Sequence, residues 1–148
     1  MWNTKASIWL SRICTWIFMA ILVAGLFMAQ KVAGAYIYYN HKPDELWPVL
    51  YTAYYICCVP AVVLLWNLHR LLECISRGEV FTTQNVKALR IISWCCMAAA
   101  LICLIYSWFY LPFLFVVAAA AFMALILRVL KNVFEQAVTL KQENDFTI

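Results

Sequence analysis

Cysteines are the residues of this chain with the clearest capacity for chemistry. Seven occur, and four of them form the adjacent pairs Cys57-Cys58 and Cys95-Cys96. Redox exchange between thiols favours a Cys-x-x-Cys pair, which the chain lacks. Adjacent residues on a helix point about 100° apart, which is a poor geometry for a disulfide. The sequence therefore favours free thiols that pack as small apolar side chains over a redox centre.

A second group with potential chemistry is His69, Glu73 and Cys74, which fall within one helical turn. A zinc site needs converging Cys, His or carboxylate ligands, and no fourth ligand is evident. No Ser/His/Asp constellation, phosphate-binding loop or pair of catalytic carboxylates can be assembled either. We therefore expect no catalytic residue, no metal and no cofactor, and we do not expect an enzyme.

The amino-acid composition indicates that most of the chain lies in a membrane. Of the 148 residues, 67% are apolar and only 12% are charged, whereas charged residues make up about a quarter of a soluble domain. A soluble protein of this size has too little interior to hide that much apolar surface. The net charge of +4 is compatible with nucleic acid, but its placement along the chain fits membrane orientation better. We predict contact with the lipid bilayer and no direct contact with nucleic acid.

Four apolar runs are long enough to cross a bilayer, which takes about 20 residues in a helix. We place the spans at residues 8–29, 46–66, 91–111 and 113–130. Their central parts contain no Asp, Glu, Lys, Arg or His, each of which costs about 2.5–3.5 kcal/mol at mid-bilayer. The first run is long for a signal peptide and is expected to be an anchor. The predicted fold is an all-α, single-domain, four-helix bundle over residues 1–148.

Basic residues predict the direction of the spans. If the N-terminus is cytoplasmic, nine basic residues are inside and two are outside. The inner set is Lys5, Arg12, Arg70, Arg77, Lys87, Arg90, Arg128, Lys131 and Lys141, and the outer set is Lys31 and Lys42. The positive-inside rule therefore places both termini in the cytoplasm.

The span interiors look suited to packing. Ion-coupled transport usually needs an ionisable group within the membrane, and the span centres have none. Small residues instead recur at intervals of four, which lets membrane helices approach closely; they are Ala20 and Ala24, Cys95, Ala99 and Cys103, and Ala120 and Ala124. Pro112 is expected to stop the third helix, so spans three and four form a tight antiparallel hairpin.

Two segments are expected to extend spans into the cytoplasm as amphipathic helices. One is the inner loop at residues 67–90, where Gly78 is placed to end a helix and Thr82 to cap the next. The other is the tail at residues 131–148. The sequence leaves three arrangements open: the two elements lie on the membrane, bind a partner, or pack on each other.

The tyrosines gather on the opposite side. All eight fall in the outer loop, residues 30–45, or in the outer halves of spans. An aromatic belt at the membrane interface accounts for this placement. The alternative is a ligand surface around Tyr36, Tyr38, Tyr39 and Trp47, as in a self-protection or envelope-stress protein that meets a peptide or lipid.

Two stretches resemble a known family. They are residues 77–93, at positions 77–81, 85–87 and 89–93, and residues 134–148, which end in Glu-Asn-Asp-x-Thr-Ile. With four spans and this length, they resemble small bacterial membrane proteins classed only as a domain of unknown function. Such proteins are often encoded beside a helix-turn-helix regulator of the Cro/CI type. The resemblance implies the membrane component of a regulatory pair, in the bacterial inner membrane.

These lines lead to one functional hypothesis: a non-enzymatic, regulatory membrane protein that binds a cytoplasmic regulator. The predicted partner-binding residues lie in the inner loop and the tail; they are Arg77, Glu79, Phe81, Asn85, Lys87, Arg90, Phe134, Lys141, Glu143, Asn144 and Asp145. The outer aromatic surface remains an alternative, as does a small transporter or membrane thiol-redox enzyme, and a homo-oligomer is compatible with each.

Overall fold

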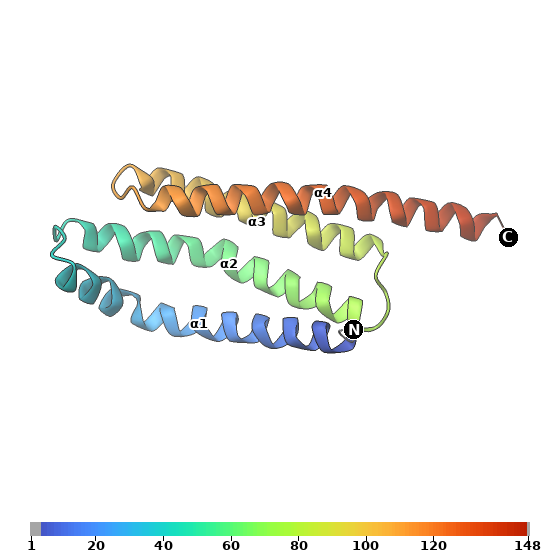
Figure 1. Cartoon of the computed structure of the whole chain (residues 1–148), viewed down its shortest axis with the longest axis horizontal. Helices are drawn as coiled ribbons and strands as arrows, with labels where there is room; N and C mark the ends of the chain where they lie inside the picture. The colour runs from blue at the N-terminus through green and yellow to red at the C-terminus, as the bar shows by residue number, and fades with distance from the viewer. Residues whose placement is uncertain (1–3, 148) are drawn as a thin grey trace.

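The computed structural model describes residues 4–147, with side chains from Ala6 onward, so the Lys5 side chain and Ile148 lie outside it. The described chain folds into four α-helices and no strand (Figure 1). They are α1 (Thr4–Tyr39), α2 (Leu46–Ser76), α3 (Thr83–Ser107) and α4 (Phe113–Phe146). All four are long and apolar enough to cross a membrane. The predicted all-α fold with four spans is confirmed.

Local sequence explains the break between α2 and α3. Gly78, with φ at +84°, adopts the left-handed conformation that glycine tolerates and other residues avoid. The Thr82 hydroxyl then accepts a hydrogen bond from the backbone nitrogen of Asn85 at 3.3 Å, which caps α3 as expected from the sequence. Six residues, 77–82, therefore separate two long helices.

The helix α1 is longer than the sequence predicted. Most of residues 30–45 was expected to be a loop, but α1 continues to Tyr39 and leaves only residues 40–45 to connect it to α2. Ala33 and Ile37, one turn apart, are 7% and 5% exposed, so this part of the helix has a packed face. The Gln30 carbonyl also accepts a hydrogen bond from Trp47 Nε1. These contacts stabilise helix where polar residues and glycine suggested a loop.

The two ends of the molecule differ in composition. Both described termini and the α2–α3 loop lie at one end, and the α1–α2 loop and the α3–α4 turn lie at the other (Figure 1). We call the first the basic end, because it carries Arg70, Arg77, Lys87 and Arg90. We call the second the tyrosine end, because the tyrosines lie in that half of the helices.

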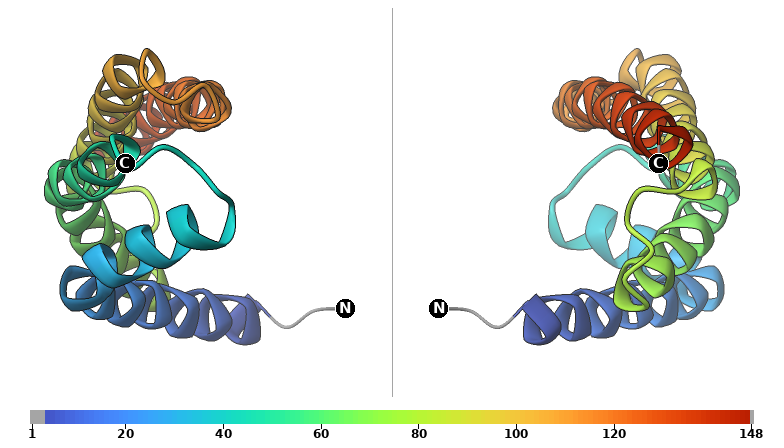
Figure 2. Two further views of the ribbon diagram at one scale, coloured as in Figure 1. Left: turned by 90° about the vertical axis from the view of Figure 1, so that its left-hand side faces the viewer. Right: turned by 90° about the vertical axis from the view of Figure 1, so that its right-hand side faces the viewer.

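The helices form an open row. Among the described residues, contacts join α1 to α2, α2 to α3 and α3 to α4, but not α1 to α4. Seen end-on, the row curves into a crescent with α1 and α4 at its tips (Figure 2). Large apolar side chains cover much of the surface, including Phe27 at 80% and Phe115 at 81% exposed. Such a surface belongs in lipid rather than in water.

The hairpin of α3 and α4 is the most closely packed pair. Ser93 Oγ, in a buried side chain, donates to the Ala124 carbonyl at 2.9 Å, and Ala124 is 1% exposed. Cys95 and Cys103 are also buried. The predicted packing role of small residues is therefore confirmed on α3 and at Ala124. It is wrong for Ala20 and Ala24, which are exposed, because that face of α1 meets no neighbouring helix.

The pair of α1 and α2 is held differently, by side chains of α2 that bind backbone carbonyls of α1. Tyr54 donates to the Leu22 carbonyl at 3.0 Å and Tyr55 to the Leu26 carbonyl at 2.9 Å. Trp47 makes a third hydrogen bond of this kind, from its Nε1 to the Gln30 carbonyl at 3.2 Å. The three acceptors are four residues apart, so they lie on one face of α1. Interhelical hydrogen bonds of this kind contribute about 0.6–2 kcal/mol each within a membrane.

The Tyr54 contact generates a test, because it requires glycine at position 25. A Cβ added at Gly25 would lie 1.9 Å from the Tyr54 hydroxyl. Gly25→Ala should displace the phenol, break its bond to Leu22 and destabilise the protein by about 1–3 kcal/mol, measured by unfolding in detergent.

Gly34→Ala is the matched control, because its Cβ would make ordinary contact with Trp47 at 3.6 Å. It should leave stability unchanged or raise it by about 0.5–1 kcal/mol. In a Tyr54→Ala background, Gly25→Ala should no longer destabilise the protein, because the clashing phenol is absent. Equal effects of the two glycine substitutions would contradict the Tyr54 contact.

Candidate functional site

The basic end has a small core of its own. Leu71, Ala88, Leu89 and Ile92 are buried together. Partly buried side chains of α2 and α4 pack against them; these are Leu64, Leu68, Ile75, Leu127 and Phe134. Of the three arrangements that the sequence left open, the structure shows the inner loop packed against the first turns of the tail, at Phe81 and Phe134, while residues 139–147 stay exposed. Any binding surface at this end of the molecule is therefore supported by a packed apolar core.

Asn85 holds the α2–α3 loop against this core. It is 1% exposed, and its Nδ2 donates to the carbonyls of Glu79 and Val80, each at 2.8 Å. Its backbone nitrogen also binds the Thr82 hydroxyl. One buried amide thus satisfies two loop carbonyls that would otherwise lack partners, and it sets the path of the loop.

The loop and α4 meet directly. The rings of Phe81 and Phe134 lie 5.5 Å apart, and Arg90 lies 3.7 Å from Glu135. Lys131 pairs with the same carboxylate at 2.7 Å. The hydrogen bond and charge of Lys131, with a smaller contribution from Arg90, lower the pKa of Glu135. The carboxylate therefore stays ionised and joins α3 to α4.

The structure brings only some of the predicted site residues together. Phe81, Arg90 and Phe134 form the contact just described. Arg77 binds Glu73 at 2.6 Å, Glu79 is exposed, and Lys87 lines a cavity between α2 and α3. Four residues are exposed on the last turns of α4; they are Lys141, Glu143, Asn144 and Asp145.

For Asn85, the prediction of a partner-binding side chain is wrong, because the structure buries it. A polar residue inside a loop-to-helix segment suggested a surface position. Its two loop acceptors lie five and six residues earlier in the chain, and the sequence does not show that the loop folds back on it.

The end of α4 stands clear of the other helices. Every residue from 139 to 147 is exposed, and α4 continues past the α2–α3 loop (Figure 1). The helical part of this segment, residues 139–146, is about 12 Å long at 1.5 Å per residue. Leu140 and Phe146 are 65% and 90% exposed. We call residues 139–147 the free segment.

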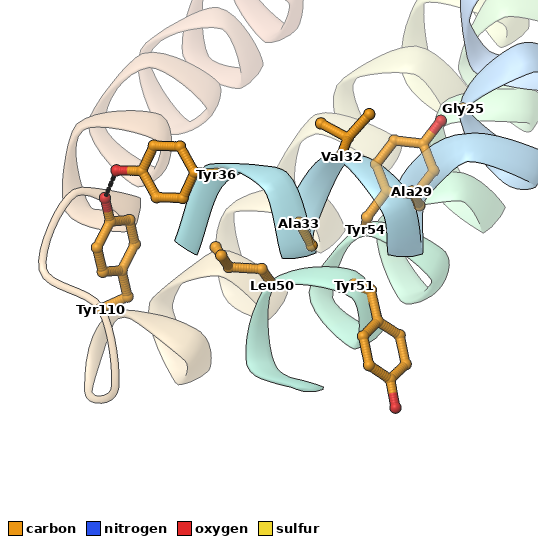
Figure 3. A pocket seen from close by; sticks show the side chains of 9 residues that line it. All are labelled: Gly25, Ala29, Val32, Ala33, Tyr36, Leu50, Tyr51, Tyr54 and Tyr110. Carbon is orange, nitrogen blue, oxygen red and sulfur yellow. Dashed lines mark hydrogen bonds between the residues drawn. The ribbon is translucent and has the colours of Figure 1, made fainter. Parts of the chain in front are cut away.

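The tyrosine end contains an apolar cavity of about 360 Å³ between α1 and α2 (Figure 3). Gly25, Ala29 and Ala33 form its α1 wall, and Tyr54 reaches across it toward Gly25. At its outer edge, the hydroxyls of Tyr36 and Tyr110 lie 2.5 Å apart. This hydrogen bond joins the last turns of α1 to the α3–α4 turn. Of the residues in the predicted tyrosine surface, Tyr36 lines this cavity, whereas Tyr38, Tyr39 and Trp47 do not.

The cysteines show one contact that the sequence did not reveal. The sulfur atoms of Cys57 and Cys103 lie 3.9 Å apart, between α2 and α3. They share an apolar cavity of about 510 Å³ with Cys95 and Cys96. The two sulfurs are about 2 Å farther apart than in a disulfide, and all seven cysteines are free. The pair joins residues 46 apart, so only the register of α2 against α3 determines it.

The candidate metal ligands are separated. His69 packs its ring edge-on against Trp16, with centroids 5.3 Å apart, while Glu73 binds Arg77. Within residues 4–147, no three His, Cys, Asp or Glu side chains gather closely enough to hold a metal ion.

Four apolar helices, with most of the basic residues at one end, define the class of this molecule: a small membrane protein with four spans. The chain belongs to the family described as "Protein of unknown function (DUF2975)", whose model matches residues 34–148. It is also similar to the uncharacterized membrane protein YoaS of Bacillus subtilis (strain 168), with 25% identity over 168 aligned residues and 99% of each chain covered. No solved structure matches the chain.

These comparisons confirm the resemblance to an uncharacterised family of membrane proteins. They contain nothing about a neighbouring regulator, so that association stays a prediction.

Asn85 allows a test of the basic end. Asn85→Ala should leave the Glu79 and Val80 carbonyls without partners and destabilise the protein by about 1–3 kcal/mol, measured by thermal unfolding in detergent. The α2–α3 loop should also become more sensitive to limited proteolysis. Asn40→Ala is the control, since its amide makes one exposed hydrogen bond, to Tyr36. A loop that stays protected in Asn85→Ala would contradict the role of the buried amide.

Proposed function

We propose that this protein is a non-enzymatic regulatory component that holds a cytoplasmic protein at the membrane. The observation that carries the proposal is the free segment, which stands beyond the α2–α3 loop with every side chain exposed. The 34 residues of α4 span about 51 Å, whereas the hydrocarbon core is about 30 Å thick. Roughly 20 Å of α4 is thus available outside the lipid.

The distribution of charge supports a cytoplasmic basic end. Among described side chains this end carries Arg12, Arg70, Arg77, Lys87, Arg90, Arg128, Lys131 and Lys141, while the tyrosine end carries only Lys31 and Lys42. Loops rich in Lys and Arg stay in the cytoplasm during insertion. With this orientation, the free segment and the α2–α3 loop face cytoplasmic proteins in the inner membrane of a bacterial cell.

The side chains of the free segment support a protein partner. Leu140 and Phe146 are apolar and exposed, and they flank a polar run that contains Lys141, Glu143 and Asp145. Because these two residues are six apart, they lie about 120° apart around the helix, so a partner that contacts both would have to enclose the free segment. Phe81, 45% exposed, extends the apolar surface at the loop. The family resemblance suggests a helix-turn-helix regulator as the partner.

The cavity at the tyrosine end favours a second candidate, a protein that meets a lipid or apolar peptide on the outer side. Its walls are almost entirely carbon, which suits an acyl chain or an apolar side chain. In that case Tyr36 and Tyr110 would control access, and the free segment would be dispensable.

Co-purification from detergent extracts tests the first candidate. The full chain is produced together with the helix-turn-helix regulator that the family resemblance predicts to be encoded beside it. Leu140→Ser/Phe146→Ser removes both apolar anchors and leaves the charge unchanged. Loss of two such anchors should weaken the complex at least about tenfold, since every 1.4 kcal/mol of binding energy is tenfold. Tyr38→Ser/Tyr39→Ser is the matched control, because these side chains are equally prominent, at 78% exposed each, on the other end.

Capture of the regulator by wild type and control, but not by the anchor variant, is the expected result. Full retention by Leu140→Ser/Phe146→Ser would contradict the role of the free segment. Loss of the complex only in Tyr38→Ser/Tyr39→Ser would indicate that the partner binds at the tyrosine end.

A further inference from the structure

We propose that the cavity between α2 and α3 at the basic end binds the phosphate of an anionic phospholipid through Arg70 and Lys87. The cavity has a volume of about 520 Å³. It is lined by α2, with Arg70, on one side and by the start of α3, with Gln84, Lys87 and Ile91, on the other. This site contains no residue of the free segment.

The charge in the cavity is not neutralised by the described protein. The ion pairs among residues 6–147 use Arg77, Arg90 and Lys131, so neither Arg70 nor Lys87 has a carboxylate partner. No Asp or Glu lines the cavity. Glu73, one turn beyond Arg70, is bound to Arg77. Two cations in one half-enclosed space make a site that favours an anion.

Arg70 is held in position for such a ligand. With its oxygen turned to the guanidinium, the Gln84 amide accepts hydrogen bonds from Arg70 Nη2 at 2.6 Å and from Arg70 Nε at 2.9 Å. A guanidinium has five N–H donors, so three remain. A planar group fixed by a neutral neighbour suits bidentate binding to phosphate, and its charge is undiminished. Lys87 supplies a second, mobile cation across the cavity.

The depth of the cavity favours a lipid over a soluble phosphate. The apolar run of α2 ends at Trp66, which is 66% exposed, and the apolar run of α3 begins at Ile91, which is 41% exposed. An exposed tryptophan at the end of an apolar run indicates the headgroup level. A phosphate on Arg70 and Lys87 would therefore lie among the headgroups, with its acyl chains beside Ile91. Basic pockets between membrane helices suit anionic headgroups in this way.

Lipid binding to the detergent-purified full chain tests the proposal. Phosphatidylglycerol, phosphatidylcholine and inorganic phosphate are added in separate titrations, and binding is followed by native mass spectrometry and by the shift in Tm. The wild type should prefer phosphatidylglycerol over phosphatidylcholine by about tenfold or more. Inorganic phosphate at the same concentration should produce no shift.

Arg70→Gln/Lys87→Gln should abolish this preference. The control Arg12→Gln/Lys141→Gln removes the same charge from the same end, leaves the Glu73–Arg77 pair intact, and should keep the preference. Arg70→Lys retains the charge but loses the planar guanidinium that can bind phosphate with two parallel hydrogen bonds. The preference of this variant for phosphatidylglycerol over phosphatidylcholine should therefore fall about threefold to tenfold. Arg70→Lys also serves as the informative variant if the double substitution does not yield folded protein.

Two results would overturn the proposal. An equal loss of preference in the control would show that net charge, rather than this cavity, attracts the lipid. An effect of inorganic phosphate as large as that of phosphatidylglycerol would show a free-phosphate site in place of a lipid site.

Discussion

The arrangement of the basic end depends on the hydrogen bonds of one buried amide. Asn85 ties the carbonyls of Glu79 and Val80 to the first turn of α3. This fixes the loop, so that Phe81 meets Phe134 on α4. Because Asn85 is on α3, the same contact sets the loop relative to Arg90, which pairs with Glu135. Without it, the Glu79 and Val80 carbonyls would lose their hydrogen-bond donor and the loop would lose its tie to α3.

The rest of the fold reflects how helices associate in lipid. The bilayer is as apolar as the side chains, so burial of apolar surface does not hold the helices together there. Close contact between small residues holds α3 to α4, as at Ser93 and Ala124. Hydrogen bonds from Tyr54 and Tyr55 to carbonyls hold α1 to α2. With few such contacts, the row stays open, and cavities remain between neighbouring helices.

The sequence predicted what depends on local pattern. The four spans, the turn at Gly78 and the cap at Thr82 follow from apolar runs and from the preferences of individual residues. It did not predict what depends on which helices meet. Ala20 and Ala124 have similar neighbours in the chain, yet only Ala124 is buried, because only its face meets another helix. The Cys57–Cys103 contact, the length of α1 and the open row were hidden for the same reason.

The central claim is that the basic end works in the cytoplasm, and the accessibility of cysteines to a membrane-impermeant maleimide tests it most directly. Asp145→Cys places a thiol on the free segment, and His41→Cys places one in the α1–α2 loop; both positions are exposed. The native Cys74, near the basic end, gives the background. Labelling of position 41 in intact cells, and of position 145 only after the cells are permeabilised, is the predicted result. Labelling of position 145 in intact cells would contradict the account.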